Sequence, residues 1–296
     1  MLVVSLLIIY AANGVAAAVT KTYSSNIDAA IEYYNQWGDP ANTNYGNDIH
    51  LAIGNSWMYG EPLDYYWRWG SLIYFNTGSD LNGKTILSAT LRLYVYATAI
   101  QKDGRYVVYP IAQTWNEGTV TWNNSPTWWL APNREASAPQ TNDEYTEWDV
   151  TEIVQYWASG ARANYGFYVE DVKVPDVCYM CADNQITEYF SSDYGNAAYW
   201  PKLVVTYPCA NKPVKVGNDA AAFDYIQDAY NAAASPQTIR AQAVTLGETL
   251  NFSVSKIIDL RGGYDCDFVT QSGFTTINGS LTIKAGTITV GNVIIN

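Results

Sequence analysis

Residues 113–126, QTWNEGTVTWNNSP, hold residue types that could do chemistry on a sugar. Trp115 and Trp122 lie seven residues apart with Glu117 between them, and a carboxylic acid beside aromatic rings could protonate a glycosidic oxygen. The alternative is a structural corner, in which a turn at Gly118 leads into a strand whose residues alternate between two faces. The segment alone leaves both interpretations open.

Hydrolysis of a glycosidic bond would need a second carboxylate in the same cleft, at a separation of about 5–9 Å. No sequence spacing selects a pair from the candidates, which are Glu61, Asp64, Glu117, Asp143 and Glu144. His50 is the single histidine, so a multi-histidine metal site is excluded and a Ser-His-Asp triad would have to use that residue. We therefore do not expect an enzyme.

Aromatic residues form a second constellation that could bind a glycan without catalysis. In PLDYYWRWG, the side chains of Tyr65, Trp67 and Trp69 would share one face of a strand. Trp128 and Trp129 form an adjacent pair, and such rings stack on the C–H faces of sugars, while Glu61, Asp64 and Arg68 could bond sugar hydroxyls. The alternative left open is that one of the alternating sets belongs to the core.

Calcium is the cofactor that hard oxygen ligands in this sequence could hold. Asp28 lies near the first strand of the first domain and Asp193 lies before its last strand, so the two carboxylates could meet because the termini of a jelly roll lie close together. The alternative is that both are solvated surface acids. We expect at most a structural role for such an ion.

The charge balance limits the partners. The net charge is −12, with 16 Lys and Arg residues, so nothing would neutralise a nucleic-acid backbone. An acidic surface also disfavours polyanionic glycans unless calcium bridges the two. The sequence has 25 Tyr and 11 Trp residues but only 7 Phe. Aromatic side chains with a polar group suit partly solvated surfaces, including sugar-binding faces, and they also suit the ordinary exterior of a β-sheet.

Alternating strands separated by turn clusters dominate residues 19–207, as in ATLRLYVYA and KLVVTY. One helix is predicted over 148–160, with Val150, Ile153, Val154 and Trp157 on one face and Thr151 or Asp149 as its cap. One short helix among many strands predicts an all-β fold, a jelly-roll β-sandwich.

Residues 208–219, rich in proline and glycine, read as a linker to a smaller domain at 220–296. A helix is predicted at its start, with Asp219 as cap and an apolar stripe of Phe223, Ile226, Ala229, Tyr230 and Ala233. Short strands follow in TIRAQAV, IIDLRGG, TTING, SLTIKAG and TITVGNVII. Alternating apolar residues with Gly or Asn at corners predict a short right-handed parallel β-helix capped by that helix.

An apolar run at residues 2–9 followed by small residues has the layout of a signal peptide spanning residues 1–18. Retained on the chain, the same arm would suit docking as a strand in a neighbouring subunit. Four cysteines in a secreted chain allow three pairings; we expect Cys178–Cys181 to close a loop and Cys209–Cys266 to tie the two domains.

Several segments of the first domain, taken in order, resemble a known family. They are NYGNDIHLAIGNS, RWGSLIYFNTGSDLNGKTILSATLRLYV, QTWNEGTVTWNNSP, WDVTEIVQYWASGARANYGF and EYFSSDY followed by WPKLVVTY. This order is similar to the DNRLRE-type domain, to carbohydrate-binding module family 96 and to disaggregatase-related repeats. The resemblance implies a secreted jelly-roll module for glycan or surface attachment, with a structural calcium plausible by analogy. The second domain resembles the start of a pectate-lyase-like β-helix in RGGYDCDF, GFTTINGSLTI and GTITVGNVII.

The resemblance also changes the interpretation of residues 113–126, which recur in modules with unrelated partners. We therefore expect Trp115 and Trp122 to pack as structure and Glu117 to accept hydrogen bonds from backbone amides. The sequence predicts a non-catalytic extracellular or cell-surface module whose partner is an extracellular polysaccharide or cell-surface glycan. The alternative is a structural subunit that self-associates into a filament or surface layer through its apolar arm and exposed β-edges.

Overall fold

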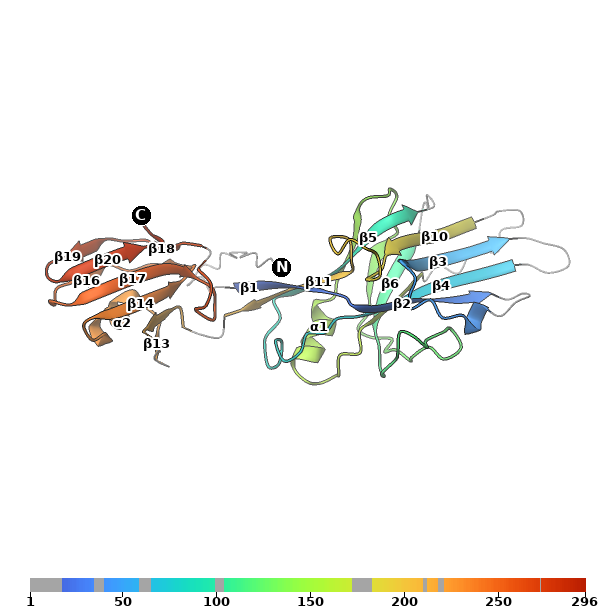
Figure 1. Ribbon diagram of the computed structural model, residues 1–296, viewed down its shortest axis with the longest axis horizontal. Coiled ribbons are helices and arrows are strands. Elements are labelled where there is room, and N and C mark those ends of the chain that lie inside the picture. The colour runs from blue at the N-terminus through green and yellow to red at the C-terminus, as the bar shows by residue number, and fades with distance from the viewer. Residues whose placement is uncertain are drawn as a thin grey trace. The chain divides into compact units, whose positions relative to one another are not determined.

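The computed structural model describes residues 18–34, 40–58, 65–98, 104–171, 183–209, 212–217, 221–271 and 273–296. They belong to two compact units, one of residues 21–205 and the other of residues 206–296 together with 18–20 (Figure 1). The expected all-β class is confirmed, because strands dominate both units and the described residues hold two short α-helices. Neither of those helices is long and apolar enough to cross a membrane.

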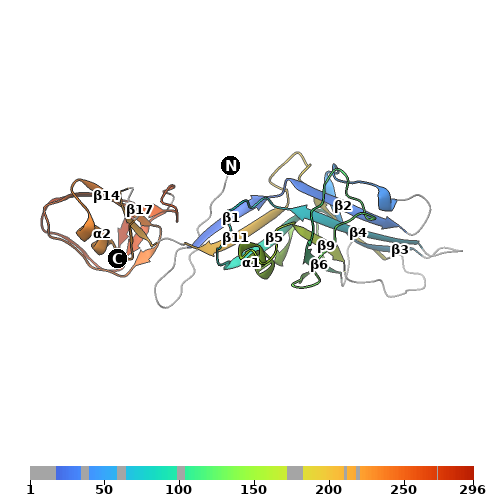
Figure 2. The same cartoon turned by 90° about the horizontal axis from the view of Figure 1, so that it is seen from below.

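Eleven of the described strands form the sheet of the larger unit. Their order is β1-β11-β5-β10-β3-β4-β9-β6-β7, with β2 paired to β4 and β8 paired to β5, and the sheet curls on itself as a β-sandwich requires. Figures 1 and 2 show β1 and β11 side by side. The strands are β1 (Ala18–Ser24), β2 (Ile27–Tyr34), β3 (His50–Met58), β4 (Tyr65–Tyr74), β5 (Ser88–Thr98), β6 (Arg105–Pro110), β7 (Arg134–Ser137), β8 (Tyr145–Asp149), β9 (Phe167–Asp171), β10 (Asp183–Phe190) and β11 (Lys202–Pro208).

Strand β5 shows why the sequence alternates as it does. Leu91, Leu93 and Val95 are fully buried, whereas Arg92 and Tyr94 between them are only partly buried. Successive residues of a strand point to opposite faces, so one face of β5 forms core and the other meets solvent. The outward positions are thereby free to carry polar and aromatic side chains.

Helix α1 (Thr151–Ala158) is shorter than the predicted 148–160. Its predicted apolar face is confirmed, because Ile153, Val154 and Trp157 are buried. Gly160 follows the helix with a φ of 74°, a left-handed conformation that ends helices and that glycine adopts without steric cost.

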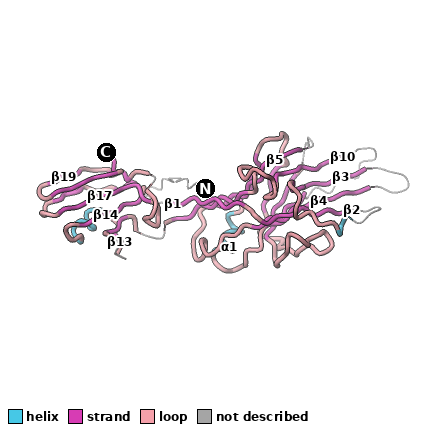
Figure 3. Tube along the Cα trace, viewed as in Figure 1, coloured by secondary structure: helices cyan, strands magenta, loops and turns pink. Residues whose placement is uncertain are grey.

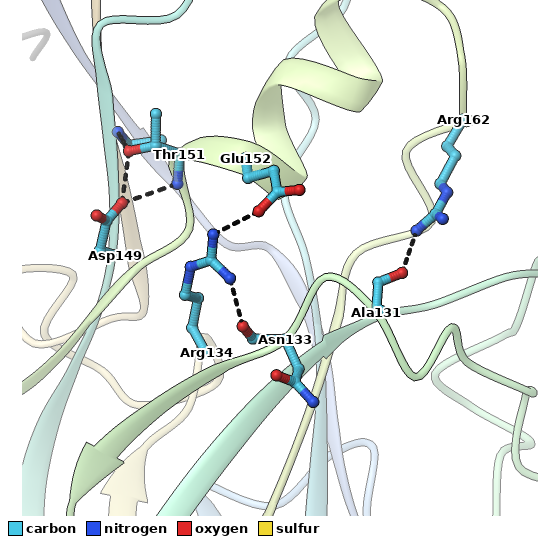
Figure 4. Close-up of polar contacts among 8 residues, drawn as sticks. Ala131, Asn133, Arg134, Asp149, Thr151, Glu152 and Arg162 are labelled. Atoms are coloured by element: carbon cyan, nitrogen blue, oxygen red, sulfur yellow. Dashed lines mark hydrogen bonds and ion pairs between the residues drawn. The ribbon is translucent and has the colours of Figure 1, made fainter.

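At the start of α1, the predicted capping role of Asp149 is confirmed, although Asp149 lies one residue before the N-cap position. Val150 occupies the N-cap position and makes no side-chain capping bond. Asp149, one residue earlier, instead accepts hydrogen bonds from the backbone N–H of Thr151 at 3.0 Å and from its hydroxyl at 2.5 Å (Figure 4). These bonds from Thr151 lower the pKa of the Asp149 carboxyl.

The smaller unit is built from three parallel ladders, β14-β17-β20, β15-β18-β21 and β16-β19, drawn as stacked strands in Figure 3. Ladders of this kind occur in parallel β-helices, and assignment to that fold stays a prediction. The elements are β12 (Val214–Val216), β13 (Ala222–Phe223), α2 (Ile226–Ala232), β14 (Gln237–Gln242), β15 (Thr245–Leu246), β16 (Leu250–Phe252), β17 (Ile257–Tyr264), β18 (Thr275–Ile277), β19 (Leu281–Ile283), β20 (Thr287–Gly291) and β21 (Val293–Ile295).

Helix α2 begins later than predicted, after the extended residue Tyr225. The predicted cap, Asp219, lies outside the described residues. The first two backbone N–H groups of α2, those of Ile226 and Gln227, donate to the carboxylate of Glu248 at 2.9 Å each. A residue 22 positions further along the chain therefore satisfies the helix start.

The disulfide between Cys209 and Cys266 is present. Both cysteines belong to the smaller unit, so the bond crosslinks that unit rather than tying two domains as expected. Cys178 and Cys181 lie outside the described residues.

Within the predicted linker, Val214–Val216 form β12, which pairs with β13 and β14.

Candidate functional site

The segment 113–126 covers one side of the large sheet. Trp115 and Trp122 pack against a cluster of buried residues, and the indole N–H of Trp115 donates to the carbonyl of Tyr165 at 3.0 Å. The cluster contains Ala29, Ile31, Leu72, Val107, Tyr109, Ile111, Val120 and Tyr168. The prediction that these tryptophans pack as structure is confirmed.

Glu117 fastens this segment to β2. Its Oε1 accepts the backbone N–H of Asp28 at 2.7 Å, as the sequence predicted for an amide-anchoring carboxylate. The backbone carbonyls of Glu117 and Val120 both accept from the side-chain amide of Asn44 at 2.7 Å. Glu117 therefore has a structural role, because it links the segment 113–126 to β2. Of the other acids weighed for hydrolysis, Glu61 and Asp64 lie outside the described residues.

Asp28 and Asp193, the predicted calcium ligands, have different environments. Asp28 is 1% exposed and accepts the backbone N–H of Ser192 at 3.1 and 3.2 Å, whereas Asp193 is exposed. Burial raises the pKa of Asp28 to about 7, and hydrogen bonds from Ser192 and Ser25 oppose that rise. Burial also raises the pKa of Glu117, to which the charge of Asp193 adds.

Asp28 and Asp193 alone supply few of the oxygen ligands that a calcium ion takes. Among the residues that the structure describes, no group of three or more Asp, Glu, His or Cys side chains is arranged to hold a metal. The Asp28 carboxylate is already engaged by backbone amides, and calcium in proteins takes six to eight oxygen ligands. Calcium binding by Asp28 and Asp193 stays a prediction.

The tryptophans of β4 meet aromatic partners on neighbouring segments. Trp67 stacks on Tyr34, with ring centroids 4.3 Å apart and planes within 9°, and Trp69 lies 5.2 Å from Tyr45. Both tryptophans are partly buried. The side chain of Tyr65, the third member of the predicted platform, lies outside the described residues. Each of the two described rings therefore already has one aromatic neighbour, which leaves less free ring surface than the sequence predicted.

The side chain of Arg68, which lies between these tryptophans in the chain, is directed toward Glu170 and Trp122. Its guanidinium pairs with the buried carboxylate of Glu170 and lies 5.6 Å from the ring of Trp122. Glu170 also accepts the hydroxyl of Tyr168 at 3.1 Å. The role predicted for Arg68, bonding of sugar hydroxyls, has to compete with this ion pair.

Trp128 and Trp129 point to different environments. Trp128 packs on Tyr168 with centroids 4.2 Å apart and belongs to the covering layer of the buried cluster. Trp129 is 47% exposed, and the guanidinium of Arg162 lies 4.7 Å from its ring and 4.7 Å from the ring of Tyr156. Arg162 donates to the carbonyl of Ala131 at 2.8 Å (Figure 4). Trp129 is thus the member of the predicted pair that offers a ring to solvent.

A larger group of aromatic rings lies on the outward face of β5 and was not predicted. Tyr94 lies 4.9 Å from Tyr145 of β8 and 4.6 Å from Tyr199, and Tyr96 lies 4.0 Å from the ring of His50. We name this group the β5 array and define it as His50, Tyr94, Tyr96, Tyr145, Tyr194 and Tyr199, packed around Phe190. The signal in the sequence is LYVYA, residues 93–97, where the tyrosines Tyr94 and Tyr96 flank the buried Val95.

In a comparison with known families, residues 20–207 match the family described as "Carbohydrate-binding module family 96". The chain belongs to carbohydrate-binding module family 96. The family 96 region starts in β1 and ends in β11, so it contains the covering segment, both tryptophan constellations and the β5 array. No curated protein matches the chain closely enough to stand as a relative.

Proposed function

We propose that this chain is a secreted, non-catalytic module that attaches to an extracellular polysaccharide or cell-surface glycan. The observation that carries the proposal is a carbohydrate-binding family domain, at residues 20–207, that presents aromatic rings to solvent. Tyrosine and tryptophan combine a large apolar ring with a polar group, which suits the mixed apolar and hydroxyl surface of a sugar. Attachment needs such rings and no reacting group.

Two features support the extracellular location. The apolar stretch at residues 2–9 and the small residues after it have the composition of a signal peptide. The disulfide between Cys209 and Cys266 is of a kind that persists mainly in oxidising compartments. N-terminal sequencing of the protein recovered from culture medium tests this part: a start near Val19 supports secretion with cleavage, and retention of the chain inside the cell contradicts it.

Glycan binding is tested on the full chain with an array of neutral and acidic glycans. The Trp129→Ala variant and the Trp67→Ala/Trp69→Ala double variant are measured beside the wild type, with circular dichroism to establish that each is folded. Binding of the wild type to at least one glycan is the expected result. Absence of binding to every neutral and acidic glycan on the array refutes the proposal.

A second candidate function is self-association, and one observation favours it. Strands β19, β20 and β21 are the outermost strands of their ladders, and they expose apolar side chains, each more than 40% accessible. These are Ile283, Val290, Ile294 and Ile295. Exposed, unpaired strand edges can recruit other strands. Light scattering over a range of protein concentrations tests this candidate, and a monomer at all concentrations excludes it.

A further inference from the structure

We infer that the β5 array is a surface along which the chain binds a neutral oligosaccharide. The inference rests on the proposed glycan-binding function and specifies its contact residues and ligand class. The array lies on the solvent side of β5, β8 and the segment joining β10 to β11, within the family domain.

The rings of the array form a continuous chain of contacts. Tyr145 meets Tyr94 edge to face at 4.9 Å, Tyr94 lies 6.1 Å from Phe190, and Phe190 lies 5.2 Å from Tyr96. Tyr96 then stacks on His50 at 4.0 Å. Phe190 is buried beneath the group, while Tyr96 is 45% exposed. An extended series of rings matches several linked sugars better than a single one.

The array is held rigidly. The inward residues of β5, Leu91, Leu93 and Val95, are fully buried, so the strand cannot rotate its tyrosines away from solvent. The segment before β11 is fixed by internal bonds, including one from the indole N–H of Trp200 to the carbonyl of Tyr194 at 2.6 Å. Rings fixed before binding lose little conformational freedom when the ligand arrives.

Charged groups surround the array with both signs, which favours a neutral ligand. At one end, the Arg92 guanidinium lies 4.1 Å from the Tyr145 ring and is paired with Glu147 at 2.6 Å. Partial desolvation raises the pKa of Tyr94, and the negative charge of Asp143 adds to that rise. Lys202 lies beside Tyr145, with its ammonium 3.4 Å from the hydroxyl.

A further acid lies at the other end of the array. His50 faces Asp48, with 3.9 Å between its Nδ1 and a carboxylate oxygen. A polyanionic glycan would bring its carboxylates near these acids, on a chain whose net charge is −12. A neutral glycan avoids that repulsion and can use the tyrosine hydroxyls and Lys202 as hydrogen-bond partners.

Compared with the tryptophans of β4, the array offers more accessible ring surface. Trp67 is stacked face to face on Tyr34, so one face of each ring is covered. In the array, Tyr96 is 45% exposed although it stacks on His50, whereas Trp67 and Trp69 are only partly exposed. The array therefore ranks above the β4 pair as a contact surface for an oligosaccharide.

The test is isothermal titration calorimetry on the full chain with cellohexaose, laminarihexaose and mannohexaose as neutral probes and hexagalacturonic acid as the acidic probe. The variants are Tyr96→Ala and the double variant Tyr94→Ala/Tyr96→Ala. The matched control is Tyr225→Ala, because Tyr225 is 49% exposed, close to the 45% of Tyr96, and lies in the other unit. Circular dichroism and thermal melting establish folding, and Tyr96→Ala, a change at an exposed side chain, keeps the test usable if the double variant unfolds.

The expected result is binding of at least one neutral hexasaccharide by the wild type, a loss of about tenfold or more in the double variant, and an unchanged affinity in Tyr225→Ala. Wild-type affinity in both array variants, with binding lost in Trp67→Ala/Trp69→Ala or in Trp129→Ala, overturns the inference and leaves the proposed function standing. Binding of hexagalacturonic acid alone overturns the neutral ligand class. Failure of the wild type in this panel and on the glycan array removes the proposed function itself.

Discussion

Replacement of Asp28 by asparagine should change how the stability of the larger unit depends on pH. The side chain is 1% exposed and accepts the backbone N–H of Ser192. Burial raises its pKa from 3.8 to about 7, with Glu117 adding to the rise and hydrogen bonds from Ser192 and Ser25 opposing it. The folded chain therefore keeps a proton on Asp28 at pH values where the unfolded chain has released it.

The sign follows from proton linkage. Between the unfolded pKa of 3.8 and the folded value of about 7, the folded state binds more protons, so the free energy of unfolding falls as pH rises through this window. A shift of about three pKa units at about 1.4 kcal/mol per unit corresponds to about 4 kcal/mol lost by the upper end of the window. Asparagine cannot ionise and still offers an oxygen to Ser192, so Asp28→Asn should be more stable than the wild type by up to about 4 kcal/mol near pH 8.

The assay is urea unfolding at about pH 4, 6 and 8. All tryptophans lie between residues 37 and 200, so their fluorescence reports on the larger unit. Asp267→Asn, at an exposed position of the smaller unit, is the control. Near pH 4 the wild type and Asp28→Asn should unfold at similar urea concentrations. The same pH dependence in both proteins, or a less stable Asp28→Asn near pH 8, would refute the reasoning.

Three other changes have defined outcomes. Glu117→Ala leaves the backbone N–H of Asp28 without its acceptor and should lower the free energy of unfolding by about 1–3 kcal/mol in urea titrations. Glu117→Gln should lower it by less, and the glycan affinity of both variants should be unchanged. Cys209→Ser/Cys266→Ser opens a crosslink between positions 57 residues apart and should cost about 2–4 kcal/mol, seen as a lower melting temperature of the smaller unit; an unaltered melt contradicts this. Gly263→Ala places a methyl group 2.0 Å from a backbone carbonyl oxygen at a φ of 80° and should cost more than about 1 kcal/mol, whereas Gly195→Ala, with open space around it, should have little effect on the melt.

Local periodicity made much of the fold predictable. The alternation of Leu91, Leu93 and Val95 with polar residues gave β5 its inward face, and the spacing of Ile153, Val154 and Trp157 gave α1 its buried side. These patterns are decided by neighbours in the sequence, because side-chain direction repeats with a fixed period in strands and helices.

Features decided by distant partners could not be predicted in the same way. The first N–H groups of α2 are satisfied by the carboxylate of Glu248, which lies much later in the chain. The sequence around the predicted cap, Asp219, does not indicate that partner. The smaller unit has the short strands β15 and β16, of two and three residues, which are too brief to show a periodicity.

The candidate site was harder to predict than the fold, because exposure depends on which segment covers which face. Trp128 and Trp129 are adjacent in sequence, yet Trp128 packs on Tyr168 and Trp129 faces solvent. Tyr94 and Tyr96 lie in a strand that was correctly predicted, but their meeting with residues of β8 and of the segment after β10 depends on strand order. Strand order is a long-range property of the sheet.

The pairing of β1 with β11 bears on how such modules spread among proteins. The family match starts in β1 and ends in β11, and these two strands are neighbours in the sheet, with the hydroxyls of Thr20 and Thr206 2.9 Å apart. A domain whose entry and exit lie together can be placed into a surface loop of a host protein without forcing the flanking chain apart. Residues 20–207 are therefore suited to insertion into another protein. A host enzyme that carries them in a loop should keep its own fold and acquire the binding properties of the module.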